Sequence, residues 1–211
     1  WIGVTAGQFG EQVSGVAKGL IAAGVRPGDR VALLSATRYE WSLFDYAIWA
    51  AGAVSVPIYD SSSTEQIRWI LEDSEACLAI VETPRHEALF VGMPETLRRV
   101  VQIEADAVNT LLAEGADVDD AELKARLAGI RSADLASLVY TSGTTGRPKG
   151  CMLTHANFLS EVRAILTSSV GAVAKPGNRG LTFLPLAHVL ARAVSLALFE
   201  AGAAQAHWAD F

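Results

Sequence analysis

The residues best suited to chemistry lie together in segment 138–150, where three apolar residues lead into hydroxyl-bearing residues and glycines that end in a lysine. Glycine has no β-carbon, so the backbone at Gly143, Gly146 and Gly150 can bend sharply and bring N–H groups close to an anion. Hydroxyl groups donate hydrogen bonds to phosphate oxygens or offer a lone pair to Mg²⁺. With Lys149 as the counter-charge, the segment predicts a loop that cradles phosphate groups. Its hydroxyl-bearing residues are Thr141, Ser142, Thr144 and Thr145.

This loop differs from the Walker A type of phosphate-binding loop. Five positions after Gly143 the Walker motif requires glycine, and here Pro148 stands there. A Walker loop also opens a helix directly, whereas residues 151–153 resemble a second short strand before Thr154, a typical helix cap. We therefore expect a loop between two strands. A flexible Gly/Ser/Thr linker is the alternative, and the apolar flanks and the Arg-Pro-Lys end argue against it.

Residues 140–150, Tyr-Thr-Ser-Gly-Thr-Thr-Gly-Arg-Pro-Lys-Gly, resemble the signature loop of the adenylate-forming enzymes. That family includes acyl-CoA synthetases, luciferases and the adenylation domains of peptide synthetases. Residues 37–41, 56–62 and 184–188 resemble its long-chain fatty acid–CoA ligase branch. The resemblance covers nearly the whole chain and is weakest across the acidic stretch 104–122.

The resemblance implies a reaction in two steps. A fatty acid carboxylate attacks the α-phosphorus of ATP and expels pyrophosphate, and the thiolate of coenzyme A then displaces AMP from the acyl-adenylate. By analogy, the loop including Ser142, Gly143, Thr144, Thr145 and Gly146 binds the nucleotide. Thr141 is then the candidate hydroxyl near Mg²⁺, and Lys149 is the candidate contact to the β- and γ-phosphates.

His188 is the second candidate for chemistry. It follows a predicted strand and is therefore expected at the carboxyl edge of a parallel sheet, where such sheets bind ligands. The family resemblance places it near the acyl carboxylate and the developing adenylate, and a structural histidine is the alternative. Arg192, one helical turn later, is expected either to pair with a carboxylate or to face solvent. His155 is expected to serve a helix start, and His86 and His207 have no local partner in the sequence.

The elements that must position these residues alternate between strands and helices. Three Ser/Thr residues stand three positions before Glu or Gln, the signature of a capping box, and we expect helices to begin there. The alternation implies right-handed crossovers and an α/β fold, with a mainly parallel sheet and helices on both faces. The capping pairs are Thr5 with Gln8, Thr37 with Glu40 and Ser63 with Gln66. Predicted strands span 30–34, 53–58, 76–81, 99–103, 181–184 and 203–208, and further helices lie at 119–128, 154–166 and 189–199.

Composition limits the classes of partner. The 211 residues are 51% hydrophobic, enough for a substantial core, and the net charge is −6 without a basic cluster, so nucleic acid is excluded as a partner. The longest apolar stretch, 47–58, is too short to span a membrane. Cys77 and Cys151 lack partners at metal-ligand spacing, which predicts two buried free thiols in a reducing cytosol.

The later motifs of the family do not occur in the sequence: the acidic metal ligand after a Tyr-Gly segment, the ribose-binding aspartate and the C-terminal domain with its lysine. We therefore expect residues 1–211 to be the N-terminal part of an AMP-binding domain, cytoplasmic, with fatty acid, ATP and coenzyme A as its partners. Peripheral membrane contact for the lipid substrate and a homodimer remain options. Two alternatives stay open, a peptide-synthetase adenylation domain, disfavoured by the ligase-like segment 37–62, and a non-catalytic nucleotide- or acyl-binding module.

Overall fold

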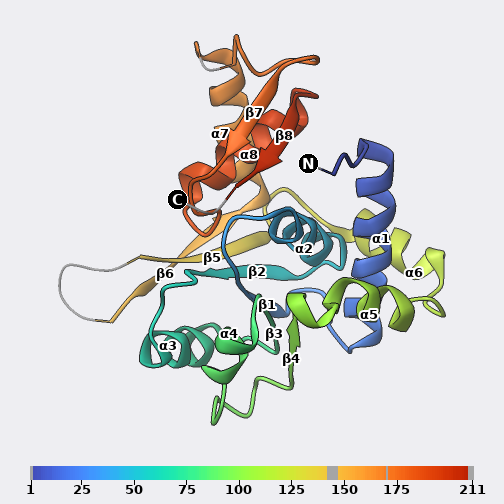
Figure 1. Cartoon of the computed structure of the whole chain (residues 1–211). Helices are drawn as coiled ribbons and strands as arrows, with labels where there is room; N and C mark the ends of the chain where they lie inside the picture. The colour runs from blue at the N-terminus through green and yellow to red at the C-terminus, as the bar shows by residue number, and fades with distance from the viewer. Residues whose placement is uncertain (1, 142–146, 170, 209–211) are drawn as a thin grey trace.

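The computed structural model describes residues 2–141, 147–169 and 171–208, so the predicted loop residues 142–146 lie outside the described residues. Within them, a sheet of six strands has the order β4-β3-β1-β2-β5-β6 (Figure 1). The strands from β4 to β5 run parallel, and β6 returns antiparallel to β5. The prediction of a mainly parallel sheet is confirmed. The bounds are β1 Arg30–Leu34, β2 Val54–Ile58, β3 Leu78–Val81, β4 Arg99–Gln102, β5 Leu135–Thr141 and β6 Lys149–Thr154.

Helices cover both faces of this sheet, as the strand–helix alternation predicts. One face packs on α1, α2, α5 and α6, and the other packs on α3 and the segment that follows α4 (Figure 1). A short 3-10 helix, η1 Ile103–Ala105, follows β4. The bounds are α1 Ala6–Ala22, α2 Tyr39–Ala50, α3 Thr64–Ser74, α4 Pro84–Ala88, α5 Ala107–Glu114 and α6 Asp120–Gly129.

Alternate residues of β1 enter two different hydrophobic clusters. Val31 and Leu33 pack with α1 and α2, whereas Ala32 and Leu34 pack with α3, and all four side chains are buried. Successive side chains of a strand point to opposite faces of its sheet. A strand that is apolar at every position must therefore be covered on both sides, which is why the short apolar runs predicted buried parallel strands.

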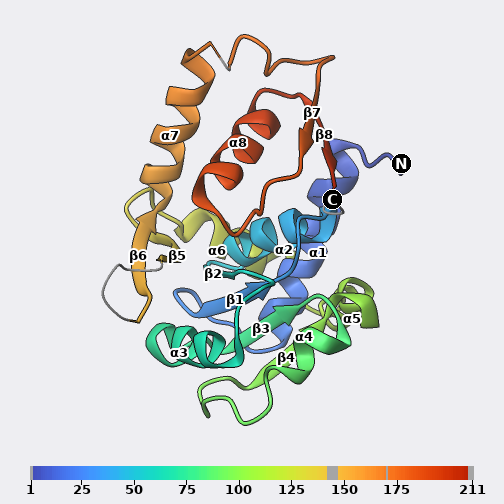
Figure 2. The ribbon, with the colours of Figure 1, turned by 60° about the vertical axis from the view of Figure 1, so that its left-hand side comes forward.

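A second layer lies over the α2 side of the large sheet (Figure 2). It contains α7 His155–Thr167, α8 Val189–Glu200 and a small sheet in which β7 Arg179–Thr182 pairs parallel with β8 Ala204–His207. Aromatic contacts of Phe199 with Phe9 and Tyr46 join this layer to α1 and α2. The layer thus brings the end of α8 against the first helices of the chain.

Most of the predicted helix caps are present. Thr5, Ser63 and Thr154 each accept a hydrogen bond from the backbone N–H three residues later and complete a capping box. Thr37 does not, and the prediction of a capping box there is wrong. Its hydroxyl instead donates to the carbonyl oxygen of Leu184 at 2.8 Å and accepts from the N–H of Leu186 at 3.3 Å. These two partners are distant from Thr37 in the sequence, so a pattern of neighbouring residues cannot predict the contact.

Two further features of the structure differ from the sequence-based prediction. The acidic stretch contains a helix, α5, that the sequence reading missed, and its Leu111 is buried against α1. The two helices approach closely at Gly19, where a β-carbon would lie 2.1 Å from the carbonyl oxygen of Leu111. Cys77 is buried as predicted, but Cys151 is exposed because it lies on β6, the edge strand of the sheet.

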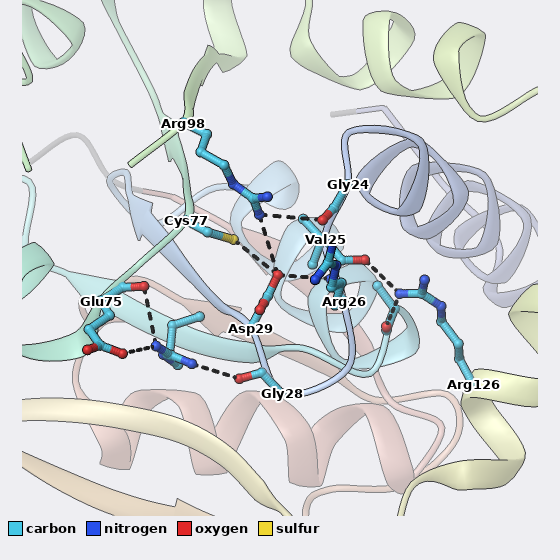
Figure 3. A network of polar contacts seen from close by, with 11 residues as sticks. Gly24, Val25, Arg26, Gly28, Asp29, Glu75, Cys77, Arg98 and Arg126 are labelled. Atoms are coloured by element: carbon cyan, nitrogen blue, oxygen red, sulfur yellow. Dashed lines mark hydrogen bonds and ion pairs between the residues drawn. The ribbon is translucent and has the colours of Figure 1, made fainter. Parts of the chain in front are cut away.

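A network of polar contacts lies at the edge of the sheet where its parallel strands begin, at the turn before β1 (Figure 3). Asp29 accepts hydrogen bonds from the backbone N–H of Arg26 at 3.0 Å and from Arg98 at 3.5 Å, and the thiol of Cys77 lies 3.6 Å from it. Arg126 of α6 donates to the carbonyl oxygen of Val25 at 2.7 Å. No predicted site residue belongs to this network, and it fixes the edge opposite to the one that carries Thr141.

Candidate functional site

The two described residues that flank the predicted phosphate loop face each other across a hairpin. Thr141 ends β5, Lys149 begins β6, and the two are register partners with exposed side chains. Because β5 runs parallel to β2, Thr141 lies at the carboxyl edge of the sheet, where open parallel sheets bind their ligands. The two strands predicted on either side of residues 142–146 are therefore confirmed.

The alternation of side chains along β5 shows which face Thr141 and Lys149 occupy. Ser137 contacts Arg192 of α8, whereas Tyr140 packs into the cluster with α3 on the opposite face. Thr141 lies four positions after Ser137 and so shares its face. Lys149 is the cross-strand partner of Thr141 and points the same way. The hydroxyl and the ammonium group thus lie on the face of the sheet that also bears α8.

Gly150 has a packing role that the sequence did not show. It is a regular residue of β6, opposite Tyr140, and a β-carbon there would lie 3.1 Å from Cζ of the Tyr140 ring. The expectation that Gly150 gives the loop a sharp bend is therefore wrong. Its missing side chain makes room for the aromatic ring on the α3 face.

His188 caps the first turn of α8. Its Nδ1 accepts a hydrogen bond from the backbone N–H of Leu190 at 3.3 Å, and its side chain is exposed. Within the described residues, no hydrogen bond or ion pair joins His188 to Thr141 or Lys149. The structure therefore places His188 at the start of α8, on the face of the sheet that Thr141 and Lys149 share, without a hydrogen bond or ion pair between them.

A cavity of about 430 Å³ is lined in part by Ala187, the residue that precedes His188 in the sequence. Its walls are residues 35–37 after β1, Tyr59 and Asp60 after β2, and residues 183–185 with Ala187 after β7. These segments follow the carboxyl ends of their strands, so the cavity opens at the edge that also carries Thr141. Thr37 joins two of the walls through its hydrogen bonds with Leu184 and Leu186.

Arg192 forms a buried ion pair that fixes α8 to the body of the molecule. Its guanidinium donates to both carboxylate oxygens of Asp45, at 2.6 and 2.8 Å, and it lies over the rings of Trp49 at 4.8 Å and Phe158 at 4.7 Å. Both charged side chains are almost completely buried. Burial raises the pKa of the Asp45 carboxyl, and the adjacent Arg192 charge opposes that shift.

The same arginine links α8 to the strand that carries Thr141. Arg192 donates to the hydroxyl of Ser137 at 2.7 Å, and Ser137 in turn donates to the carbonyl oxygen of Ser55 on β2 at 2.8 Å. Since Arg192 lies one turn after His188, this chain of bonds sets the start of α8 relative to β5. The two separate parts of the predicted site are thereby held in one rigid arrangement.

Sequence reasoning found some of these residues and missed others. Arg192 was expected either to pair with a carboxylate or to face solvent, and the pairing is observed. The indication in the sequence was a single charged residue within an apolar helix. Asp45, its partner, lies 147 positions away and had no local signal. His207 does have a partner, since its Nε2 lies 3.2 Å from the hydroxyl of Ser42, and His155 stacks edge-on against Trp49.

Comparison with known proteins agrees with this geometry. The pattern of the family described as AMP-binding enzyme matches residues 1–210. The parallel sheet, the antiparallel pair β5–β6, the sequence Thr-Ser-Gly-Thr-Thr-Gly at 141–146 and the match together define the class, and the chain belongs to the AMP-binding enzyme family.

Within this family the chain is similar to the long-chain-fatty-acid–CoA ligase FadD15 of Mycobacterium bovis and of Mycobacterium tuberculosis. It is 50% identical to each over 206 residues, which cover 95% of this chain and 34% of the relative. The structure also resembles the N-terminal domain of FACL13 from Mycobacterium tuberculosis, with a TM-score of 0.84 and 27% identity over 99% of this chain and 51% of that one. The chain thus spans about a third of the length of these curated relatives.

Proposed function

We propose that the chain is the N-terminal part of an ATP-dependent long-chain fatty acid–CoA ligase. The protein would form an acyl-adenylate and pyrophosphate from fatty acid and ATP, and then acyl-CoA and AMP. The observation that carries this proposal is the register pair of Thr141 and Lys149, which places a hydroxyl and an ammonium group side by side at the carboxyl edge of a parallel sheet. The similarity to FadD15 supports the choice of acid and acceptor and does not favour the peptide-synthetase alternative.

In this proposal the hairpin binds the triphosphate of ATP. Negative charge increases on the phosphate oxygens as the carboxylate attacks and pyrophosphate leaves, so preorganised donors lower the barrier. Lys149 is exposed and carries a positive charge at the base of the loop, which suits a contact to the β- and γ-phosphates. The loop residues Ser142, Gly143, Thr144, Thr145 and Gly146 remain part of the proposed nucleotide site.

The residues present fit a magnesium ion only in part. Mg²⁺ prefers oxygen ligands and usually binds through substrate phosphates and a small number of protein groups. The hydroxyl of Thr141 is exposed at the strand end, on the face that would receive the phosphates, and we propose it as the ligand from this chain. When bound with ATP, the ion would neutralise part of the phosphate charge.

His188 is proposed to serve the acyl half of the reaction. Its exposed side chain stands at the N-terminus of α8, directly after Ala187 in the wall of the cavity formed by residues 35–37, 59–60, 183–185 and Ala187. A hydrogen-bonding imidazole there would orient the fatty acid carboxylate for attack, while the Arg192–Asp45 pair keeps α8 in place.

The proposal also covers where in the cell the protein acts and how it assembles. None of the helices in the described part of the chain combines the length and the apolar character needed to cross a bilayer. We propose a cytoplasmic ligase that takes its fatty acid from a membrane surface by peripheral contact, with a homodimer as its assembly. Coenzyme A would enter as the second substrate.

The test is ATP–pyrophosphate exchange by the full-length protein with Lys149→Ala, at saturating fatty acid. Loss of a charge-assisted contact to phosphate should lower exchange about tenfold to a hundredfold. Lys124→Ala is the matched control, because Lys124 is an exposed lysine on α6, away from the hairpin. Exchange at the wild-type rate in Lys149→Ala would reduce Lys149 to a surface charge. An absence of fatty-acid-dependent exchange in the wild-type protein would refute the proposed function itself.

A further inference from the structure

We propose that Trp69 and Asp73 of α3 are positioning residues for the nucleotide-binding hairpin. Each holds one strand of the hairpin next to its loop, on the face opposite to Thr141 and Lys149. The inference rests on the proposed function for its catalytic consequence, but its structural half can be tested without any activity.

Trp69 holds the second strand just before it begins. Its indole N–H donates to the carbonyl oxygen of Pro148 at 2.8 Å, and the guanidinium carbon of Arg147 lies 4.6 Å from the centre of its ring. Both contacts fall on the two residues that precede Lys149. A cation over an indole ring and a hydrogen bond to the backbone together restrict this segment in two directions.

Asp73 holds the first strand. Its Oδ2 accepts a hydrogen bond of 2.6 Å from the hydroxyl of Tyr140, the residue before Thr141. The Tyr140 ring is buried against the α3 cluster and lies over Gly150, whose lack of a side chain leaves space for it. This single ring therefore contacts α3 and both strands of the hairpin.

The helix that provides both anchors is itself well fixed. Trp69 and Asp73 are four positions apart and so lie on one side of α3, while Ile67, Ile70 and Leu71 bury the helix against the sheet. A capping box at Ser63 fixes its start. Helix α3 lies beside the hairpin (Figure 1), and its hydrogen bonds reach Tyr140 of β5 and Pro148 just before β6.

Thr141 and Lys149 are the residues from which the loop extends. The two anchors together set the position of these residues relative to the rest of the site. Register pairing holds Thr141 against Lys149, but pairing alone does not orient the hairpin toward α8. A displacement of about 1 Å in a group that contacts reacting atoms can reduce the rate by roughly a hundredfold. Residues that never touch ATP would thus control how well it is bound and aligned.

The experiment compares Trp69→Phe with Trp49→Phe in the full-length protein. Each removes an indole N–H that donates to a backbone carbonyl at 2.8 Å while a ring is kept, but the partner of Trp49 is Ala136, at the start of β5. Trp49 therefore controls for the loss of one such bond on the same sheet, away from the loop. A second pair, Asp73→Ala and Asp73→Asn, tests the other anchor, because the asparagine oxygen can still accept the Tyr140 hydrogen bond.

Two readouts are used. Peptide-resolved hydrogen exchange should show faster exchange at residues 147–154 in Trp69→Phe and at 138–141 in Asp73→Ala, with α3 itself still protected. In ATP–pyrophosphate exchange, Trp69→Phe and Asp73→Ala should each lower kcat/KM for ATP about threefold to tenfold, the range expected for one hydrogen bond, with KM for fatty acid unchanged. Asp73→Asn should recover most of the loss.

Several outcomes would overturn the inference. Unchanged hydrogen exchange at the hairpin in Trp69→Phe and Asp73→Ala would show that α3 does not hold it. Equal losses for ATP and fatty acid, matched by Trp49→Phe, would mean that these residues support the fold alone. An inactive wild-type protein would refute the proposed ligase function, and hydrogen exchange would still decide whether the anchors exist.

Discussion

His188 and Lys149 are proposed to serve different halves of the reaction, and single substitutions can separate them. Lys149 stands at the base of the loop, whereas His188 caps α8 beside a cavity. The ring of His188 is exposed and makes one local hydrogen bond, so its removal should cost little stability.

We therefore predict that His188→Ala slows acyl-adenylate formation in the full-length protein more than it weakens ATP binding. Loss of a positioned hydrogen-bonding group should reduce the single-turnover rate about tenfold or more. ATP affinity by titration and acyl-adenylate formation by rapid quench provide the two measurements. His188→Asn, which can still cap the helix, is the control. Equal losses in both measurements, or a marked fall in thermal stability, would instead make His188 a structural residue.

Two other histidines predict a pH dependence of stability. Burial lowers the pKa of His155 and of His207, and nearby Asp134 and Glu40, respectively, oppose the shift. Above about pH 6.5 both are neutral in the folded and the unfolded chain. As the pH falls below that value, the unfolded chain takes up protons that the folded chain does not. The free energy of unfolding should therefore decrease as the pH falls below that value.

Urea unfolding of the chain at pH 7.5, 6.5 and 5.5 measures this dependence. A variant with His155→Gln and His207→Gln should have a flatter profile over that range. If its slope matched that of the wild-type chain, the decrease would come from other groups.

At the scale of elements, the buried Arg192–Asp45 ion pair joins α8 of the second layer to α2, which packs on the large sheet. Asp45→Asn would leave the guanidinium buried without its counter-charge, and we predict a loss of about 3 to 5 kcal/mol in stability. Asp45→Leu combined with Arg192→Met removes both charges and should recover much of that loss. Thermal unfolding of the three proteins tests the order. If the double variant were less stable than Asp45→Asn, the pair would contribute through the Ser137 bond and ring contacts rather than charge balance.

The sequence predicted elements well where the information was local. The boxes at Thr5 and Ser63 are formed by residues three positions apart, and both were predicted correctly. Thr37 has the same local pattern, but its hydroxyl binds residues 184 and 186. The bonds of Tyr140 with Asp73 and of Arg192 with Asp45 span 67 and 147 positions. Such contacts arise from how strands are ordered in the sheet, which no short pattern specifies.

The candidate site likewise has parts that could be predicted from the sequence and parts that could not. The two strands that flank residues 142–146 could be predicted because apolar runs stand on both sides of the glycines and hydroxyls in the sequence. The face that Thr141 and Lys149 share with α8 could not, because it depends on the contact of Ser137 with Arg192. Nor could the packing role of Gly150, since a glycine in a loop-like context is more readily interpreted as a bend.

At the scale of the whole molecule, apolar side chains remain exposed on the second layer, which contains α7, α8 and the small sheet. Leu181, Leu190 and Phe199 are 54%, 54% and 41% exposed, and they lie on β7 and α8. Apolar surface of this kind usually meets another protein segment, a second copy or a lipid. It suits the proposal that further parts of a ligase pack here.

We predict that the 211-residue chain alone self-associates and does not produce acyl-CoA. Analytical ultracentrifugation should show species larger than the monomer, and Leu181→Glu with Leu190→Glu should shift them toward the monomer, because both side chains are 54% exposed. Incubation with Mg-ATP, a C16 fatty acid and coenzyme A should yield neither AMP nor thioester. Turnover at a rate normal for a ligase, about 1 per second or faster, would contradict the proposal that the chain is only one part of the enzyme.

The position of β5 beside β2 also determines when the hairpin of β5 and β6, the proposed nucleotide site, can form. The strands β1 to β4 are adjacent in the sheet and follow one another in the first half of the sequence, whereas Ser137 must find Ser55 across 82 positions. Contacts between distant residues form slowly because a long loop must close first. We therefore expect β1 to β4 to assemble early and the hairpin to join last. During synthesis on the ribosome, the ability to bind ATP would be acquired only after most of this sheet is already in place.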